Sequence, residues 1–252
     1  MRLSHTMLLA ALALCGHAAR ADGQAELKAA LERCQAQAPL KALLETKTWR
    51  RAGEGKDAEE TNGTASVFID DSARGMQLSY GREILARMDA EAHSQAKNPN
   101  AKTPTLMAAR EFAPNDLRPM ISAAGALQRV LDKAVWKSEK ADSYNGKPAR
   151  LLTYETSIDT LSDRDRKYVK DFEGVLHVWI GADGVPLASR LTQNASGRAF
   201  IVISFEAKNE EQSVYNLVGD RLIAIRKESK NKASGAGERD EYKVVKTLQL
   251  QS

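Results

Sequence analysis

The side chains that most readily perform chemistry are few in this chain and stand far apart. Beyond residue 21 the histidines are His93 and His177, which fall on segments of different expected type and lack the spacing of paired metal ligands. No Ser or Cys nucleophile stands near a histidine, and there is no glycine-rich loop of the kind that cradles phosphate. We therefore expect no catalytic residue, no cofactor and no metal, which disfavours a secreted hydrolase.

The charged residues indicate solvated surface rather than a reactive site. Asp163 and Asp165 alternate with arginines in a polar segment, where a solvated helix face is expected. The basic segment 227–232 has no aromatic neighbours, unlike a surface that binds nucleic acid. The formal net charge of +4 falls to about +2 if Arg2 and Arg20 are removed with a leader, so no strong field directs the chain toward nucleic acid.

Residues 1–21 have the layout of a secretory signal peptide. A basic start precedes the apolar run Met7–Leu14, and Ala19-Arg20-Ala21 supplies small residues before Asp22. We expect cleavage after Ala21 and a periplasmic or secreted protein with no transmembrane segment, since the apolar run is shorter than a membrane span. Lipidation of Cys15 is the alternative, but the preceding Leu14 is large for lipoprotein processing.

After such cleavage Cys34 is the remaining cysteine, so no internal disulfide can form. Its spacing from Leu27, Ala30 and Leu31 places it on the apolar face of a helix. We interpret Cys34 as a small core residue, with a redox or intermolecular role as the alternative.

The first half of the chain is expected to be mostly helical. Its predicted elements are a helical segment over 24–44 broken at Pro39, a strand over 46–50, a hairpin of strands 63–70 and 76–80, and a helical middle over about 82–133. Within the middle, apolar residues at helical spacing predict one long helix over 116–133, capped at Asn115-Asp116.

The second half is expected to be mostly strands joined by hairpins. Asn145-Gly146 and Asp183-Gly184 are hairpin turns between apolar runs. A polar helix over 162–172 and a mobile polar loop over 228–241 interrupt the strands. The fold class is therefore α+β, with a curved antiparallel meander sheet, a half-barrel, and helices packed on one side. Residues 22–252 form a single domain.

The central strands are apolar on both faces, which is unusual for an antiparallel sheet with one wet side. Val175, His177 and Trp179 alternate with a second apolar set, and the strand from residue 199 behaves in the same way. Two interpretations remain open: protein packed on both faces, or an apolar cavity on one of them. If there is a cavity, the candidate ligand-binding residues are Leu176, Val178, Ile180, Ile201, Ile203 and Phe205.

Two segments carry a family resemblance. Val135-Trp136 leads into Tyr144–Leu152 (YNGKPARLL), and Val178–Leu187 (VWIGADGVPL) runs from a strand through an Asp-Gly turn to a Pro-Leu strand start. Together with the order of elements, these segments resemble the LolA-like superfamily of periplasmic lipoprotein carriers. The resemblance implies a half-open barrel that holds acyl chains on its concave side beneath a lid of helices. No functional residue of that family matches a position here.

These observations predict a non-enzymatic periplasmic protein that binds an apolar ligand, such as the acyl chain of a lipid or lipoprotein, in the concavity of a half-barrel. The alternative is an envelope sensor or protein-interaction module on the same fold, which binds no ligand and has an envelope protein as its partner. Neither hypothesis involves nucleic acid.

Overall fold

The computed structural model describes residues 22–199 and 203–251. The predicted signal peptide, Cys15 and the candidate residue Ile201 lie outside this range.

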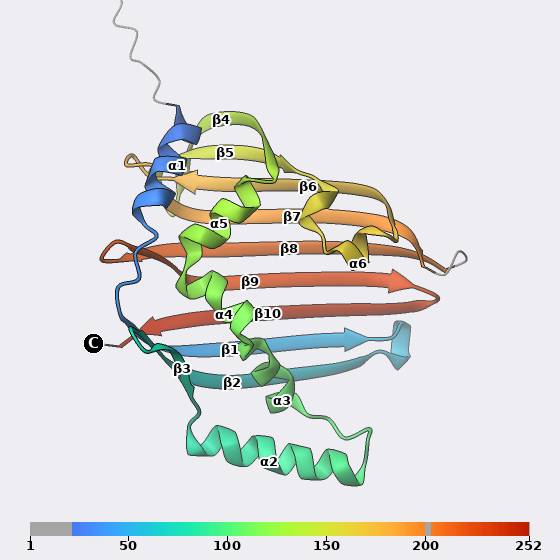
Figure 1. Cartoon of the computed structure of the whole chain (residues 1–252). Helices are drawn as coiled ribbons and strands as arrows, with labels where there is room; N and C mark the ends of the chain where they lie inside the picture. The colour runs from blue at the N-terminus through green and yellow to red at the C-terminus, as the bar shows by residue number, and fades with distance from the viewer. Residues whose placement is uncertain (1–21, 200–202, 252) are drawn as a thin grey trace, which may run out of the picture.

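Within the described residues, a sheet of ten antiparallel strands forms the body of the protein (Figure 1). Its order is β3-β2-β1-β10-β9-β8-β7-β6-β5-β4, and it is not closed into a barrel. The strands are β1 (Leu40–Ala52), β2 (Glu59–Ser72), β3 (Gly75–Ser79), β4 (Ala134–Tyr144), β5 (Lys147–Thr156), β6 (Val169–Ile180), β7 (Pro186–Ala199), β8 (Ile203–Val218), β9 (Arg221–Gly235) and β10 (Glu238–Leu250). Two meanders, β1–β3 and β4–β10, are thus joined by the pairing of β1 with β10.

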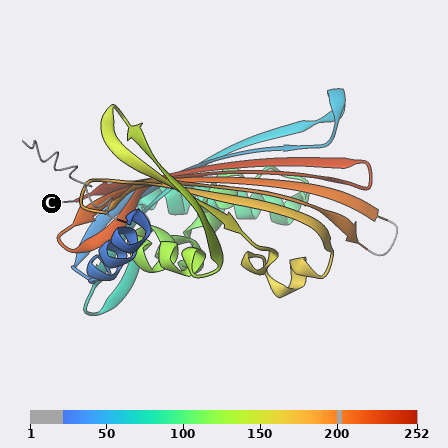
Figure 2. The same cartoon turned by 90° about the horizontal axis from the view of Figure 1, so that it is seen from above.

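Most of the helices lie against one face of this sheet (Figure 2). They are α1 (Gly23–Arg33), α2 (Arg82–Lys97), α3 (Pro104–Ala109), α4 (Pro114–Ile121), α5 (Ala123–Leu131) and α6 (Asp163–Arg166), with short 3₁₀ turns at Gly55–Asp57, Arg110–Phe112 and Ile158–Thr160. Helices α1, α5, α4 and α3 cross the strands diagonally, while α2 lies beyond β2 (Figure 1). The α+β class and the helices on one side are as predicted.

We call the side with the helices the covered face and the other side the open face. One row of directly paired residues on the covered face runs from β5 to β2, and all but Lys227 are buried. Its members are Leu152, Val178, Ser189, Ser213, Lys227, Lys246, Thr46 and Ala65. The neighbouring row on the open face contains no buried residue. Its members are Thr153, His177, Arg190, Gln212, Glu228, Val245, Lys47 and Thr64. Successive strand residues point to opposite faces, so the helices alone decide which row is buried.

The predicted helical segment over 24–44 is correct only in its first part. Helix α1 ends at Arg33, and the chain after Pro39 is the start of β1. Ala42 and Leu44 are buried while Lys41 is exposed, which is a period of two. The short apolar run is compatible with both the helical and the strand period, and it forms a strand because it pairs with β2 and β10.

The predicted helix over 116–133 is two helices. Ser122 has φ −138° and ψ 60°, which interrupts the helix between α4 and α5. The helix also begins earlier than predicted, because Pro114 occupies its first position and Ala113 is the cap. The two helices still present the buried face that the apolar spacing predicted, through residues such as Leu117 and Leu127.

Two polar segments in the second half were predicted wrongly. The helix expected over 162–172 is reduced to Asp163–Arg166, because the chain already pairs as β6 from Val169. Ser162 does cap it, by accepting a hydrogen bond from the Asp165 amide. The loop expected over 228–241 is a hairpin of β9 and β10 that turns at Ala236 and Gly237. Oppositely charged side chains of the two strands face each other. The polar sequence of this segment therefore reflects a solvated sheet face and not a loop.

The predicted hairpins are present. Asn145 and Gly146 have φ of 49° and 75°, which is the backbone that an Asn-Gly turn provides. The hairpin of β2 and β3 turns at Gly75, which also has positive φ. Cys34 ends α1 and is buried in the core, as the spacing predicted.

Within the described part of the chain, no helix combines the length and the apolar character needed to cross a bilayer.

Candidate functional site

The candidate residues share the covered face but do not form one site. Leu176, Val178 and Ile180 lie on β6 and are almost fully buried in the core. Ile203 and Phe205 lie on β8 and are half-buried. Phe205 pairs with Gly197, whereas Leu176 pairs with Leu191. Six residues of extended chain, about 20 Å, separate these two levels of the sheet.

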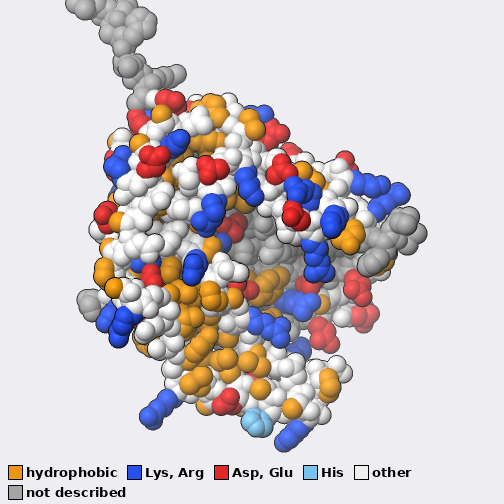
Figure 3. Space-filling model, in the orientation of Figure 1, with side chains coloured by type: hydrophobic (Ala, Val, Ile, Leu, Met, Phe, Trp, Pro, Cys, Tyr) orange, Lys and Arg blue, Asp and Glu red, His pale blue; other side chains and the backbone are white. Residues whose placement is uncertain are grey.

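Among the candidates in the described part of the chain, Leu176 lines a hollow between α4, α5 and the sheet. We call it the central hollow, and its volume is about 530 Å³. It is visible in the middle of the covered face, beside the helices (Figure 3). Its lining residues are Pro119, Ala123, Ala126, Leu127, Arg129, Val130, Asp132, Lys133, Thr160, Leu176, Ser189, Leu191, Glu211, Ser213, Tyr215 and Lys227. Pockets for small molecules commonly have about 300–1,000 Å³, so this one is of suitable size.

The helices give the central hollow an apolar wall. Ala123, Ala126, Leu127 and Val130 recur at intervals of three and four along α5, so they share one side of the helix. Ala123 and Leu127 are buried, but Ala126 and Val130 are only half-buried. Ala126 and Val130 are therefore the part of the wall that stays partly exposed.

The sheet gives the central hollow a floor that is partly polar. The hydroxyls of Ser189 and Tyr215 lie 2.7 Å apart and share a hydrogen bond. Burial raises the pKa of Tyr215 to about 12, so this hydroxyl stays neutral at ordinary pH. Beside it, the Lys227 ammonium lies 2.9 Å from the Glu211 carboxylate. Because these polar groups already have partners, an apolar group can lie over them without leaving a charge unpaired.

The arrangement is thus amphipathic: apolar helix side chains face a floor of satisfied polar groups. Nothing in it has the geometry of a nucleophile with a base. Among residues 22–199 and 203–251 no group of three or more His, Cys, Asp or Glu is placed to hold a metal ion.

The outward set on β6 occupies a different environment. Trp179 lies against Tyr144 of β4, with ring centroids 5.8 Å apart, and its indole N–H donates to Asp142 at 3.0 Å. His177 lies beside Trp179, and burial together with Arg190 and Lys140 lowers its pKa. The apolar character of this set therefore reflects packing against β4. His177 is half-buried, which makes it a boundary residue and not a fully buried core residue.

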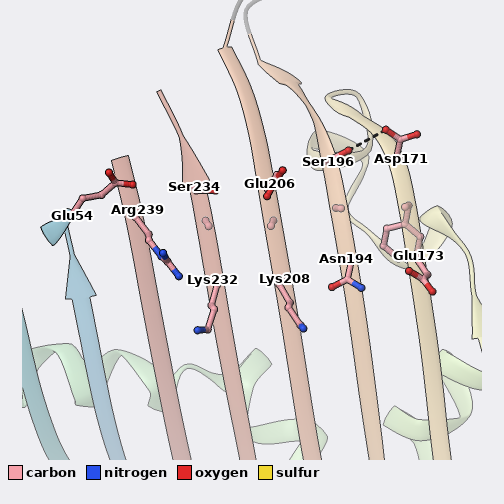
Figure 4. Close-up of a pocket in the computed structure, with 14 residues that line it drawn as sticks. Glu54, Asp171, Glu173, Asn194, Ser196, Glu206, Lys208, Lys232, Ser234 and Arg239 are labelled. Atoms are coloured by element: carbon pink, nitrogen blue, oxygen red, sulfur yellow. Dashed lines mark hydrogen bonds between the residues drawn. The ribbon is translucent and has the colours of Figure 1, made fainter. Parts of the chain in front are cut away.

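A wider hollow of about 700 Å³ lies where β6–β10 end (Figure 4). Glu173, Asn194, Lys208 and Lys232 pair in one row across its strands, on the open face with His177. Its lining mixes carboxylates with lysines and an arginine, and Ser196 donates to Asp171 at 3.1 Å. Since neither charge sign nor apolar surface dominates, this hollow does not indicate a class of ligand.

The sequence prediction missed most of the central hollow. The apolar spacing over 116–133 predicts only an amphipathic helix around Ala126 and Val130, and no pattern distinguishes Ser189, Ser213 and Tyr215 from other strand residues. One signal was available, because the apolar positions of α5 cover more of the helix than one packed side requires.

Comparison with known proteins adds no relationship. No family model, no curated protein and no solved structure matches this chain.

Proposed function

We propose that this protein is a non-enzymatic carrier that binds the apolar part of an amphipathic ligand, such as the acyl chain of a lipid or lipoprotein, in the central hollow. The observation that carries the proposal is the apolar wall of α5, partly exposed at Ala126 and Val130, above a floor whose polar groups already have partners. Burying each CH₂ group of a chain against such a wall contributes about 0.8 kcal/mol. The open, curved sheet with helices on one side supports the half-barrel interpretation.

A substitution that fills the hollow tests this function. Ala126 lines the wall, and Ala126→Trp places an indole in the space that the ligand would use. We expect the affinity for a fluorescent fatty acid, measured by titration, to fall about tenfold or more while the protein stays folded.

Ala92→Trp is the matched control, because Ala92 is an exposed residue of α2 and lines no described hollow. It should bind the probe as the unmodified protein does. Equal binding by both variants would contradict the proposal, and so would a failure of the unmodified protein to bind any acyl probe.

The second candidate is the envelope sensor or interaction module that binds no ligand. The dense packing of Val178 and Ile180 beneath the helices favours it, since these residues leave no space for a ligand. On this account the central hollow is a solvated gap, and filling it with Ala126→Trp changes no cellular function.

We also propose that the protein acts outside the cytoplasm after cleavage behind Ala21. Intact-mass measurement of the secreted form should give a chain that begins at Asp22. A mass that includes a diacylglyceryl group on Cys15 would contradict this and would place the protein on a membrane.

A further inference from the structure

A second hollow borders α5 next to the central hollow. We call it the arginine hollow; its volume is about 550 Å³, and it lies between the segment after α1, the β2–β3 hairpin, α4 and α5. Half of its lining residues are polar, and they include Arg118, Arg129 and Arg221. Arg129 also lines the central hollow, so one side chain borders both spaces.

Two of these arginines have no carboxylate partner in the described part of the chain. Arg221 is buried and satisfied, because its guanidinium donates to Asp71 and to the carbonyls of Ile121 and Ala38. Arg118 and Arg129 are exposed, and among residues 22–199 and 203–251 no acidic side chain forms an ion pair with either. The positive charge at this side of α5 is therefore not neutralised within the described structure.

The carboxylates that border the two hollows are already engaged. Asp71 pairs with Arg221, Glu211 pairs with Lys227, and Asp132 accepts a hydrogen bond of 2.7 Å from the side chain of Gln128. The lining residues of the two hollows include five cations and three carboxylates, so the combined surface attracts anions.

The guanidinium of Arg129 lies over the first turn of α5, where the neighbouring residues are small. It bends back along α5 toward Gly125, and a Cβ on that glycine would lie 3.7 Å from Nη1 of Arg129. Gly125 and Ser122 of α5 also line the arginine hollow. A group bound between Arg118 and Arg129 would thus meet no bulky side chain from this turn of the helix.

We propose that the ligand carries a single anionic head, a phosphate or carboxylate, which Arg118 and Arg129 bind while its acyl chain lies in the central hollow. This inference rests on the function proposed above and specifies the ligand class: a single-chain anionic amphiphile. Guanidinium groups suit the role because they donate paired hydrogen bonds to phosphate and carboxylate oxygens.

The test compares ligands that share one saturated chain and differ in the head group. Dodecyl phosphate, the neutral monoglyceride of the same chain length and dodecyltrimethylammonium are titrated against the protein by displacement of a fluorescent fatty acid. We expect the phosphate to bind about tenfold more tightly than the neutral ligand, which corresponds to one charge-assisted hydrogen bond. The cationic ligand should bind most weakly.

The double variant Arg118→Met/Arg129→Met removes both charges and retains the apolar length of the side chains. It should lower the affinity for dodecyl phosphate to that of the monoglyceride, and an unchanged melting temperature should show that the fold is intact. Arg82→Met, on exposed α2 away from both hollows, is the matched control and should retain the preference.

Each other outcome overturns a distinct claim. Equal binding of phosphate and monoglyceride by the unmodified protein contradicts the anionic head but leaves the carrier function standing. Binding of neither ligand contradicts both. Inorganic phosphate that competes as strongly as dodecyl phosphate would show a free-anion site, and would overturn the assignment to an amphiphile.

Discussion

The two faces of the sheet are made by the same strands, yet their side chains are buried to very different extents. On the covered face the row through Val178 is buried, and it includes Ser189, Ser213 and Lys246 among apolar residues. On the open face the row through His177 is unburied. Polar residues therefore occur on both faces, and the difference lies in burial: in the covered row all but Lys227 are buried, and in the open row none is. On the covered face Lys246 donates to the Glu111 carbonyl at 2.9 Å and pairs with its carboxylate.

Between the two faces, the largest difference in the free energy of unfolding should appear when one ion pair on each face is broken. Asp71→Asn removes the carboxylate that pairs with Arg221, whose side chain is only 2% exposed, and leaves a buried cation. We expect a loss of about 3–5 kcal/mol in the free energy of unfolding, measured by urea denaturation. Glu210→Gln breaks the pair with Arg190, which is 47% exposed, and should cost less than about 1 kcal/mol. Equal losses would mean that the Arg221 site is open to water.

A matched pair of leucines on β1 compares packing on the two faces. Leu44 is buried on the covered face, and the preceding Leu43 points to the open face and is half-buried. Leu44→Ala should lower the free energy of unfolding by about 2–5 kcal/mol, as is usual for a core leucine. Leu43→Ala should cost clearly less in the same denaturation experiment. A reversed order would show that the helices cover the other face.

High pH should destabilise the covered face through its tyrosines. Burial raises the pKa of Tyr154 and of Tyr215 from 10.0 to about 12, so folding favours the neutral hydroxyls. Their contribution is complete below pH 10 and is lost as the pH rises toward about 12, at about 1.4 kcal/mol for each pKa unit of difference. Thermal melts between pH 9 and 12 measure this loss. Tyr215→Phe should make it smaller, whereas Tyr168→Phe, at an exposed tyrosine, should leave it unchanged.

The smallest effect is expected for the charges of the open face. The hydrogen bond from Lys232 lowers the pKa of Glu241, so this carboxylate stabilises the fold above its unfolded pKa of 4.5. The stabilisation is lost as the pH falls through the lowered pKa of the folded state. Glu241→Gln should lower the free energy of unfolding at neutral pH by less than about 1 kcal/mol, and the loss should vanish in 1 M salt. A loss that persists in high salt would show that the pair is shielded from solvent.

The class of fold could be predicted from the sequence because that class depends on local signals. Asn145-Gly146 and the positive-φ glycine at Gly75 mark hairpins wherever they occur, and apolar spacing located the buried sides of α1, α4 and α5. These signals imply an antiparallel sheet with helices without any knowledge of distant contacts.

The remaining errors arise where distant pairing overrides a local pattern. The apolar run Leu40–Leu44 alone is compatible with a helix, but pairing with β2 and β10 makes it a strand. The charges over 228–241 alone suggest a loop, but they belong to a hairpin in which Lys232 pairs with Glu241. For the same reason, the sequence could not show what lies opposite the apolar side of α5 in the central hollow. Its floor joins Leu176, Ser189 and Tyr215 from three strands, and only the register of the sheet brings them beneath α5.

The account depends most on whether the covered face holds a ligand. Native mass spectrometry of the protein purified without detergent, before and after organic extraction, measures this directly. We predict one bound acyl-bearing molecule per chain, removed by extraction, regained on incubation with dodecyl phosphate, and absent from Ala126→Trp. A protein that stays empty under all these conditions, or an Ala126→Trp variant that retains the same bound mass, would contradict the carrier function.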